Sequence, residues 1–323
     1  MELKTVIIVL AVLVILVLLT SYICYRIAFY VQRKATDTGE MPLPKGRIYE
    51  PYYPQMRRWL AELQEIPREE MTITSFDGLQ LFGRFYEFAP GAPVELMIHG
   101  YRGTAEGDLC GGVQRCFSLG RSVLLIDQRT SGRSEGHTIT FGINESRDCA
   151  AWAHHLVKRF GPEIRIIITG ISMGASTVLM AAGYEELPEQ VVGVIADCGF
   201  STAREIIRKV MVDLHFPPRV MYPFVKLGAR LFGHFDLEER TALEAVERCR
   251  LPVFFIHGKD DRFVPYDMTQ RCFDACRAPK AFFTVPQAGH GLAYIMDTAG
   301  YVRALTEFSR ANDIPIYPAA ERG

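Results

Sequence analysis

The stretch Ile168-Thr169-Gly170-Ile171-Ser172-Met173-Gly174-Ala175 decides the fold. A run of β-branched residues leads into it, and a helix-forming run leads out of it. Between them, a Gly-x-Ser-x-Gly motif centres on Ser172. A serine in so sharp a strand-to-helix turn has a strained backbone and exposes its hydroxyl, and glycines flank it because larger side chains would collide. The motif predicts that Ser172 is a nucleophile; the alternative is a glycine-rich turn with a capping serine.

Two later stretches supply the other groups that a serine nucleophile needs. One follows a predicted strand and contains His257-Gly258 and the carboxylates Asp260 and Asp261. The other follows the last predicted strand and contains His290 between two glycines. Their chain order is nucleophile, acid, base, and all follow strand ends, where ligands bind in open α/β sheets. Either aspartate remains a candidate for the acid on this evidence.

A further strand end offers hydrogen-bond donors for an oxyanion. The segment His99-Gly100-Tyr101 follows a β-type run at 94–98. We expect the backbone N–H of Tyr101 and that of Met173, the residue after the nucleophile, to form a two-donor oxyanion hole.

The remaining pattern alternates β-type and helical runs. Strands are predicted at 71–75, 79–88, 94–98, 122–126, 164–169, 191–196, 252–256 and 281–285. Helices are predicted at 55–64, 108–119, 144–160, 266–275, 301–311 and after Ser172. Mostly apolar strands alternating with helices indicate an α/β fold with a mostly parallel sheet covered on both faces. Asp77-Gly78 predicts a hairpin that adds antiparallel strands at one edge.

The connection around 201–247 is too long for one helix and indicates a helical cap insertion. A helix is expected at 222–232, with Phe224, Val225, Leu231 and Phe232 at helix-face spacing. We expect the cap to lie above Ser172, and part of this apolar stripe to line an acyl pocket.

The N-terminal segment is apolar, and residues 5–24 carry no charged side chain. At ~1.5 Å per residue this run spans roughly 30 Å, the thickness of a bilayer core. We therefore expect a transmembrane anchor at 5–25, a linker at 35–54 and a catalytic domain at 55–312. A cleaved signal peptide is the alternative, although the run is too long and lacks a small-x-small site. Basic residues after the helix place the domain in the cytosol by a small margin.

Composition excludes several other classes of function. The net charge is -1, which gives no general attraction to nucleic acid. Phosphate-binding loops, CxxC pairs and HExxH motifs are absent from the sequence. The eight cysteines match neither a zinc site nor a disulfide framework, so buried free thiols are expected. We expect no metal or organic cofactor.

Five motifs in order give a resemblance to the α/β-hydrolase superfamily, over about Glu50 to Arg310. They are His99-Gly100, Asp127-x-Arg129-x-x-Gly132-x-Ser134, Gly170-x-Ser172-x-Gly174, His257-Gly258-x-x-Asp261-x-x-Val264-Pro265 and Gly289-His290. The chain resembles bacterial membrane-anchored members related to monoacylglycerol lipases, serine aminopeptidases and membrane depalmitoylases. The spacing in these relatives implies Asp261 rather than Asp260 as the acid. One departure is Thr130-Ser131, where relatives commonly carry Gly or Ala and then His, which leaves the role of this loop open.

Other polar residues have structural interpretations. Asp197 also follows a strand, and a capping role explains it. His99 is expected to be a structural loop residue, and His154-His155 a surface or packing pair. Asp127 and Arg129 are expected to brace their loop by a charge-assisted bond.

Together these features predict a membrane-anchored serine hydrolase with the triad Ser172, Asp261 and His290, acting on a carboxylic ester or thioester of a lipid-like or small-molecule acyl substrate. The alternatives are a serine aminopeptidase or small-ester (acetyl) esterase, and a non-catalytic membrane scaffold. A haloalkane-type dehalogenase would need a carboxylate at position 172.

Overall fold

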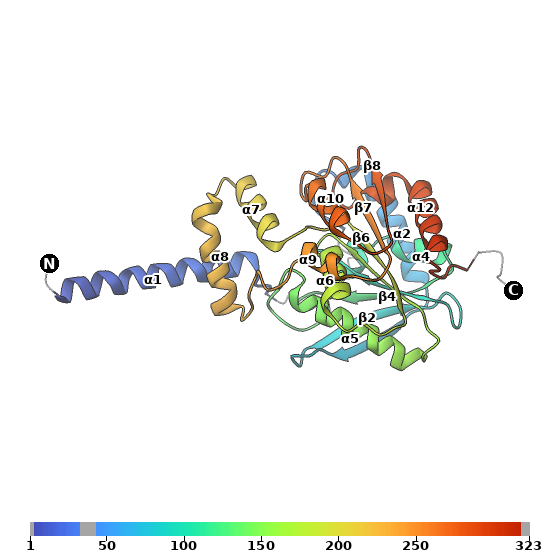
Figure 1. Cartoon of the computed structure of the whole chain (residues 1–323), viewed down its shortest axis with the longest axis horizontal. Coiled ribbons are helices and arrows are strands. Elements are labelled where there is room, and N and C mark those ends of the chain that lie inside the picture. Colours follow the sequence, from blue (N-terminus) through green and yellow to red (C-terminus); the bar gives the residue numbers. More distant parts are fainter. Residues whose placement is uncertain (1–2, 33–42, 318–323) are drawn as a thin grey trace.

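A central sheet organises the domain (Figure 1). The computed structural model describes residues 3–32 and 43–317. Within these residues the sheet has 8 strands in the order β1-β2-β4-β3-β5-β6-β7-β8. The strands are β1 (Glu69–Thr74), β2 (Gln80–Tyr86), β3 (Val94–Ile98), β4 (Ser122–Asp127), β5 (Ile166–Ile171), β6 (Val191–Asp197), β7 (Val253–Gly258) and β8 (Lys280–Val285).

Only the hairpin edge of the sheet is antiparallel. β1 pairs with β2, and β2 with β4, in antiparallel register, whereas the pairings from β4 through β3, β5, β6 and β7 to β8 are parallel. The hairpin turn contains Asp77-Gly78, as the sequence predicts, and Gly78 has a φ of +91°. The parallel strands carry apolar residues on both faces because helices cover both sides.

Two groups of helices enclose the sheet. One face packs against α5 (Ile143–Phe160), α6 (Met173–Tyr184), α9 (Ala242–Arg248) and α10 (Tyr266–Ala275). The other packs against α2 (Tyr53–Glu65), α4 (Gly112–Ser118), α11 (Ala293–Met296) and α12 (Thr298–Ala311). The predicted helices at 55–64, 144–160, 266–275 and 301–311 are confirmed to within a few residues.

The helix predicted at 108–119 begins later than predicted, at Gly112, and a separate short helix precedes it. α3 (Ala105–Asp108) ends before Gly111, which has a φ of +81°, and α4 starts at the next residue. A Cβ on Gly111 would lie 2.6 Å from the ring of Trp59, on α2. The break therefore allows α2 to pack closely against this loop.

The insertion forms helices, as predicted, and two of them lie beside the N-terminal helix. α7 (Ala203–Asp213) and α8 (Pro218–Phe232) are followed by α9. α8 starts four residues before the predicted 222–232 helix because Pro217 and Pro218 fit its first positions. A Cβ on Gly228 would lie 2.4 Å from the carbonyl oxygen of Ser21, so only glycine allows α8 this close to α1 (Leu3–Ala28).

α1 is the one helix of the described residues that is long and apolar enough to cross a membrane. Ser21, Cys24 and Tyr25 near its end are buried, and its N-terminal part projects away from the domain (Figure 1). The first part of the predicted linker, 35–42, lies outside the described residues. Residues 43–54 instead pack on the domain, with Tyr49 and Tyr53 against the apolar cluster around Met56.

Candidate active site

Ser172 sits in a strained turn between β5 and α6. Its φ is 57° and its ψ is -120°, a conformation that non-glycine residues rarely adopt. A Cβ on Gly170 would lie 2.0 Å from the carbonyl oxygen of Gly174, and one on Gly174 would lie 2.2 Å from that of Ile98. Both glycines are therefore required by backbone contacts, and the turn presents the serine hydroxyl at the end of the sheet.

The structure brings Ser172, His290 and Asp261 together from three separate loops. His290 Nε2 lies 2.9 Å from Ser172 Oγ, and its Nδ1 lies 2.7 Å from Asp261 Oδ2. The imidazole is 8% exposed, so one edge still reaches the cavity. In this arrangement the ring can accept the serine proton at Nε2 while the carboxylate holds the proton on Nδ1.

Asp261 is held as a carboxylate by several donors. Its Oδ1 accepts hydrogen bonds from the backbone N–H groups of Phe263 and Val264, both at 2.9 Å. Burial opposes its ionisation, but hydrogen bonds from His257 and His290 outweigh burial and hold its pKa well below the usual range. Asp260, the other candidate, is largely exposed and pairs with Arg262.

His257 is a neighbour of the acid that the sequence did not single out as functional. It is fully buried, and its Nε2 lies 3.1 Å from Asp261 Oδ2 and 3.0 Å from the carbonyl oxygen of Val264. Its Nδ1 lies 2.8 Å from the hydroxyl oxygen of Thr269. His257 thus fixes the position of the carboxylate. The sequence feature that could have indicated this role is the position of His257 in the His257-Gly258-x-x-Asp261 motif.

The loop after β3 passes directly beside the nucleophile. A Cβ on Gly100 would lie 3.3 Å from the Cβ of Ser172. The Gly100 N–H donates to Asp108 Oδ2 at 2.9 Å, so this donor is already used. Tyr101 follows it in the cavity wall, and Met173 is the first residue of α6. The backbone N–H groups of Tyr101 and Met173 stay predictions as oxyanion donors.

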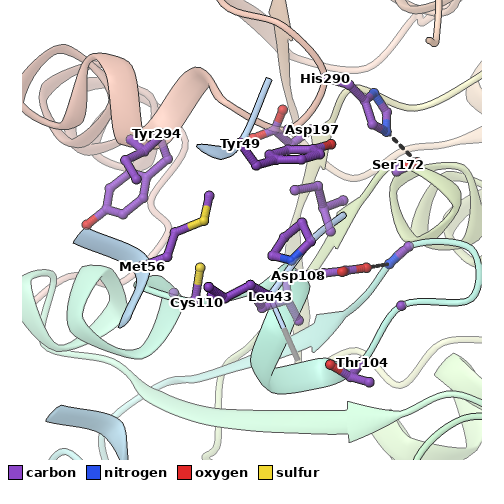
Figure 2. A pocket seen from close by; sticks show the side chains of 18 of the residues that line it. Leu43, Tyr49, Met56, Thr104, Asp108, Cys110, Ser172, Asp197, His290 and Tyr294 are labelled. Atoms are coloured by element: carbon purple, nitrogen blue, oxygen red, sulfur yellow. Dashed lines mark hydrogen bonds between the residues drawn. The ribbon is translucent and has the colours of Figure 1, made fainter. Parts of the chain in front are cut away.

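A cavity of about 870 Å³ opens beside Ser172 and His290 (Figure 2). Its walls come from segment 43–49, from α2, from the loop around Asp108 and Cys110, and from the region of Tyr294. Apolar side chains contribute much of the wall: Leu43, Met56, Trp59, Met97 and Leu109. Within the described residues, the cap insertion at 201–247 contributes nothing to it.

The expectation that the α8 stripe lines the acyl pocket is therefore wrong. Val225 is buried, while Leu231 is 42% exposed, so the four stripe residues do not share one face. Tyr222, Val225 and Ala229 pack with the end of α1 instead. The cavity walls come instead from segment 43–49, from α2 and from the regions around Asp108 and Tyr294.

Asp197 is a second correction, because it caps no helix. Thr202, not Asp197, caps α7. The Asp197 side chain lies in the cavity wall, and its buried Oδ1 has no hydrogen-bond partner among the described residues. Desolvation raises the pKa of Asp197 to about 6, although electrostatic interactions with His257 and His290 lower it in part. An unpartnered buried carboxylate in a cavity can accept a hydrogen bond from a ligand.

The neighbouring loop residues have structural roles. Arg129 pairs with Asp148 at 2.7 Å and with Asp77 at 2.9 Å, whereas Asp127 accepts from the N–H of Arg133 at 3.0 Å. Arg129 and Asp127 thus brace the loop as predicted, but each bonds to other residues and not to the other member of the pair. At Thr130-Ser131, where the sequence departs from its relatives, the Ser131 hydroxyl donates to the carbonyl oxygen of Gly103 at 2.6 Å.

The two remaining histidine sites match their structural interpretations. His99 is buried, and its Nε2 accepts from the N–H of Gln128 at 3.1 Å. His154 lies on the exposed side of α5, with its Nε2 2.8 Å from the carbonyl oxygen of Glu186.

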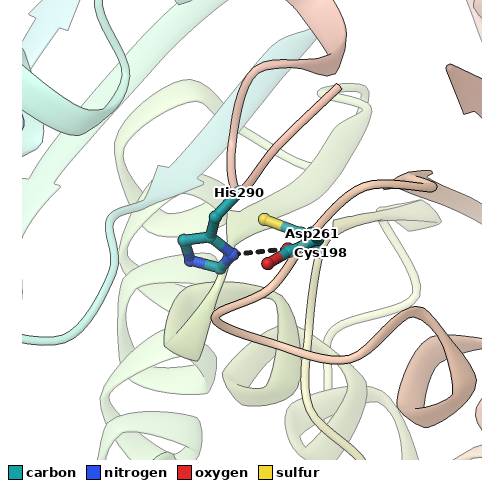
Figure 3. A group of neighbouring side chains, drawn as sticks. All are labelled: Cys198, Asp261 and His290. Atoms are coloured by element: carbon teal, nitrogen blue, oxygen red, sulfur yellow. Dashed lines mark hydrogen bonds and ion pairs between the residues drawn. The ribbon is translucent and has the colours of Figure 1, made fainter. Parts of the chain in front are cut away.

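Cys198 lies beside the acid and the base (Figure 3). The ligand atoms of Cys198, Asp261 and His290 lie within 4.8 Å of one another. Burial raises the pKa of the Cys198 thiol well above its usual value. Both ring nitrogens of His290 already have partners, Asp261 at Nδ1 and Ser172 at Nε2, so the histidine and the aspartate are arranged as a hydrogen-bonded pair. All eight cysteines are free thiols.

Comparison with known proteins defines the class. The model of the alpha/beta hydrolase family matches residues 96–304, so the chain belongs to this family. YqkD of Bacillus subtilis is 30% identical over 193 residues, which are 59% of this chain and 63% of YqkD. The match therefore spans less than two thirds of that relative.

Two solved structures show the same fold. The Pyrococcus furiosus esterase Pf2001 has a TM-score of 0.65 at 20% identity and covers 84% of this chain and 96% of its own. A puromycin-hydrolyzing peptidase of Mycobacterium tuberculosis has a TM-score of 0.61 at 18% identity and covers 80% of this chain and 40% of its own. The predicted α/β-hydrolase fold is confirmed. Its neighbours include both esterases and peptidases.

Proposed function

We propose that this protein is a membrane-anchored serine hydrolase that cleaves carboxylic esters or thioesters through an acyl-enzyme. The observation that carries the proposal is the hydrogen-bonded chain from Ser172 through His290 to Asp261. A scaffold without catalytic activity has no physical need for this chain of contacts.

In the proposed reaction, Ser172 Oγ attacks the carbonyl carbon while His290 Nε2 takes its proton. The backbone N–H groups of Tyr101 and Met173 bind the oxyanion. His290 then protonates the leaving alcohol or thiol, and the acyl group remains on the serine. Water, activated by His290, attacks this ester and releases the acid. Asp261 holds the imidazole in the required tautomer throughout.

The cavity supports an acyl substrate of medium length. Its apolar wall around Met56, Trp59 and Met97 can bury a hydrocarbon chain, and each added CH₂ is worth up to ~0.8 kcal/mol until the space is filled. We therefore expect medium-chain esters or thioesters to react faster than acetyl esters.

A second candidate function is a serine aminopeptidase, and Asp197 favours it. Its Oδ1, which has no hydrogen-bond partner among the described residues, could accept from the ammonium group of a substrate with a free amino terminus. An acyl chain with a polar group would use the same contact.

The test is the kcat/KM for p-nitrophenyl esters from acetyl to dodecanoyl, with an aminoacyl arylamide measured alongside. A maximum at a medium chain length supports the proposed function. Faster cleavage of the arylamide would favour the aminopeptidase, and a maximum at acetyl would favour a small-ester esterase. If none of these substrates is hydrolysed, the remaining interpretation is a non-catalytic membrane scaffold.

Attachment to the membrane rests on α1, whose first turns project from the domain without packing. The full-length protein should stay with membranes through high-salt and carbonate washes. A mature chain without roughly its first 25 residues would instead indicate a cleaved signal peptide. The catalytic domain is proposed to face the cytosol, and protease treatment of intact cells that removes the domain would refute this orientation.

A further inference from the structure

α8 carries two apolar stripes, and only one of them is buried within the protein. Tyr222, Val225 and Ala229 are buried against the cap and the end of α1. A second stripe consists of Val220, Phe224, Leu227 and Leu231, spaced by four, three and four residues, which places them on one line along the helix. Val220 is 59% and Leu231 is 42% exposed, while Phe224 and Leu227 are half-buried.

Further exposed apolar residues lie at the end of α7 and in the loop between α7 and α8. Val212, Leu214 and Phe216 are each more than half exposed, at 60%, 59% and 52%. Exposed apolar residues are ordinary when scattered singly, but a cluster of this kind marks an interaction site. We call the stripe together with these three residues the α8 surface.

Basic residues border the α8 surface. Arg219 and Arg230 lie near the two ends of α8, both exposed, and neither has an ion-pair partner among the described residues. They fall on the side of the helix next to the apolar stripe. An apolar stripe bordered by arginines is the pattern of a helix that lies in a membrane interface.

The position of α8 relative to α1 indicates what covers this surface. α8 runs across α1 at the end of the domain from which α1 projects (Figure 1). The two helices are in contact, with the carbonyl oxygen of Ser21 against Gly228. Where α1 enters a bilayer, a helix that crosses it at this level lies along the bilayer surface.

We propose that the α8 surface rests in the interfacial layer of the bilayer, with its apolar side chains among the acyl chains and Arg219 and Arg230 at anionic headgroups. This inference goes beyond hydrolysis and rests on the proposed role of α1 as a membrane anchor. The bilayer buries apolar area that the protein itself leaves exposed, and the arginines gain from the negative surface potential.

The proposed orientation also concerns the active site. The Tyr101 hydroxyl donates to the carbonyl oxygen of Ala28 at 2.7 Å, and Arg102 Nη2 donates to that of Ile27 at 2.8 Å. The loop beside Ser172 is thus tied to the last turn of α1. Docking of α8 would hold this loop, and with it the active site, at a fixed position close to the membrane.

The test measures depth directly in full-length protein reconstituted into phospholipid vesicles. Phe224→Trp adds a fluorophore on the stripe, and Tyr317→Trp is the control. Tyr317 is 44% exposed and follows α12, which lies on the side of the domain away from α1 (Figure 1). Brominated lipids quench tryptophan only within the bilayer, and the parent protein gives the baseline of Trp59 and Trp152. We expect quenching and a blue shift of the Phe224→Trp signal, greater with phosphatidylglycerol in the vesicles, and neither for Tyr317→Trp.

A second pair of measurements separates the possible failures. Val220→Glu with Leu231→Glu should reduce the quenching of Phe224→Trp while the protein still floats with the vesicles. Flotation without any quenching of Phe224→Trp would overturn the inference, and a dimer cross-linked through α8 in that case would assign the surface to a second copy. Loss of flotation in the parent would overturn the anchor on which the inference rests. Hydrolysis of a water-soluble ester in the same samples reports separately on the proposed function.

Discussion

Nδ1 of His290 lies 2.7 Å from Oδ2 of Asp261, and Asp260, one residue earlier, points to the surface beside Arg262. The two aspartates therefore differ in what they can do for the imidazole. One is buried and receives two backbone hydrogen bonds on its other oxygen. The other has no contact with His290 among the described residues.

This difference gives a matched pair of variants. Asp261→Asn should lower kcat by ~10⁴, because the amide would stabilise the wrong imidazole tautomer. Asp260→Asn should keep nearly full activity. Both are measured with one ester under saturating conditions, after circular dichroism has shown that they fold. A crippled Asp260→Asn enzyme beside an active Asp261→Asn enzyme would reverse the assignment.

The role of Ser172 can be tested with a covalent probe. A fluorophosphonate should label the protein, and Ser172→Ala should lose both labelling and hydrolysis, since loss of a triad nucleophile can cost about 10⁶ in kcat. Ser176→Ala on the same helix is a suitable control, because that hydroxyl donates to the carbonyl oxygen of Phe200 and lies away from the cavity. Persistent labelling of Ser172→Ala would place the nucleophile elsewhere.

The walls of the cavity should set the acyl chain length. Cys110 lies in the wall near Met56 (Figure 2), so Cys110→Phe fills space that a chain would occupy. The preferred ester should become shorter, with a loss of about fourfold in kcat/KM for each CH₂ that no longer fits. Phe224→Ala in the cap should leave the preferred length unchanged. A changed preference in Phe224→Ala, with no change in Cys110→Phe, would indicate that the cap forms the acyl pocket.

The buried carboxylate of Asp197 predicts a pH-dependent stability. Its pKa rises from 3.8 to about 6 on folding, so the folded state is favoured below pH 3.8, and this contribution is lost as the pH rises through 6. Asp197→Asn removes the cost of the charge. The variant should therefore gain up to ~3 kcal/mol over the wild type at pH 8 and little at pH 4. Thermal unfolding in detergent across this range measures the difference, and a gain that does not change with pH would contradict the explanation.

The crossing of α1 and α8 depends on Gly228. A Cβ there would lie 2.4 Å from the Ser21 carbonyl oxygen, so Gly228→Val should separate the helices and cost roughly 1–3 kcal/mol of stability. Arg230→Val, exposed on the same helix, is the control for helix propensity. Faster proteolysis at 212–216 in Gly228→Val, with wild-type behaviour in Arg230→Val, is the expected result. Equal behaviour of both variants would show that the contact contributes nothing.

Strands and most helices were predictable from the sequence for a local reason. Runs such as 123–126 and 166–168 are apolar on both faces, as a covered parallel strand requires, and the Asp77-Gly78 turn selects a hairpin. The glycines around Ser172 are likewise local, because the backbone of a strand-to-helix turn leaves no room for a Cβ. The chain order of serine, acid and base could be read in the same way.

Tertiary structure decided what depends on distant segments meeting. It brings Asp261, and not Asp260, to His290, because the turn after β7 buries one carboxylate and exposes its neighbour. It also forms the cavity wall from segment 43–49 and α2, leaves Asp197 Oδ1 without a hydrogen-bond partner in the described part of the chain, and packs α8 on α1. No periodicity or spacing in the sequence encodes these contacts, because each depends on how helices and loops pack over the sheet. The sequence by itself thus determined the elements and the candidate groups, and packing determined which of them face one another.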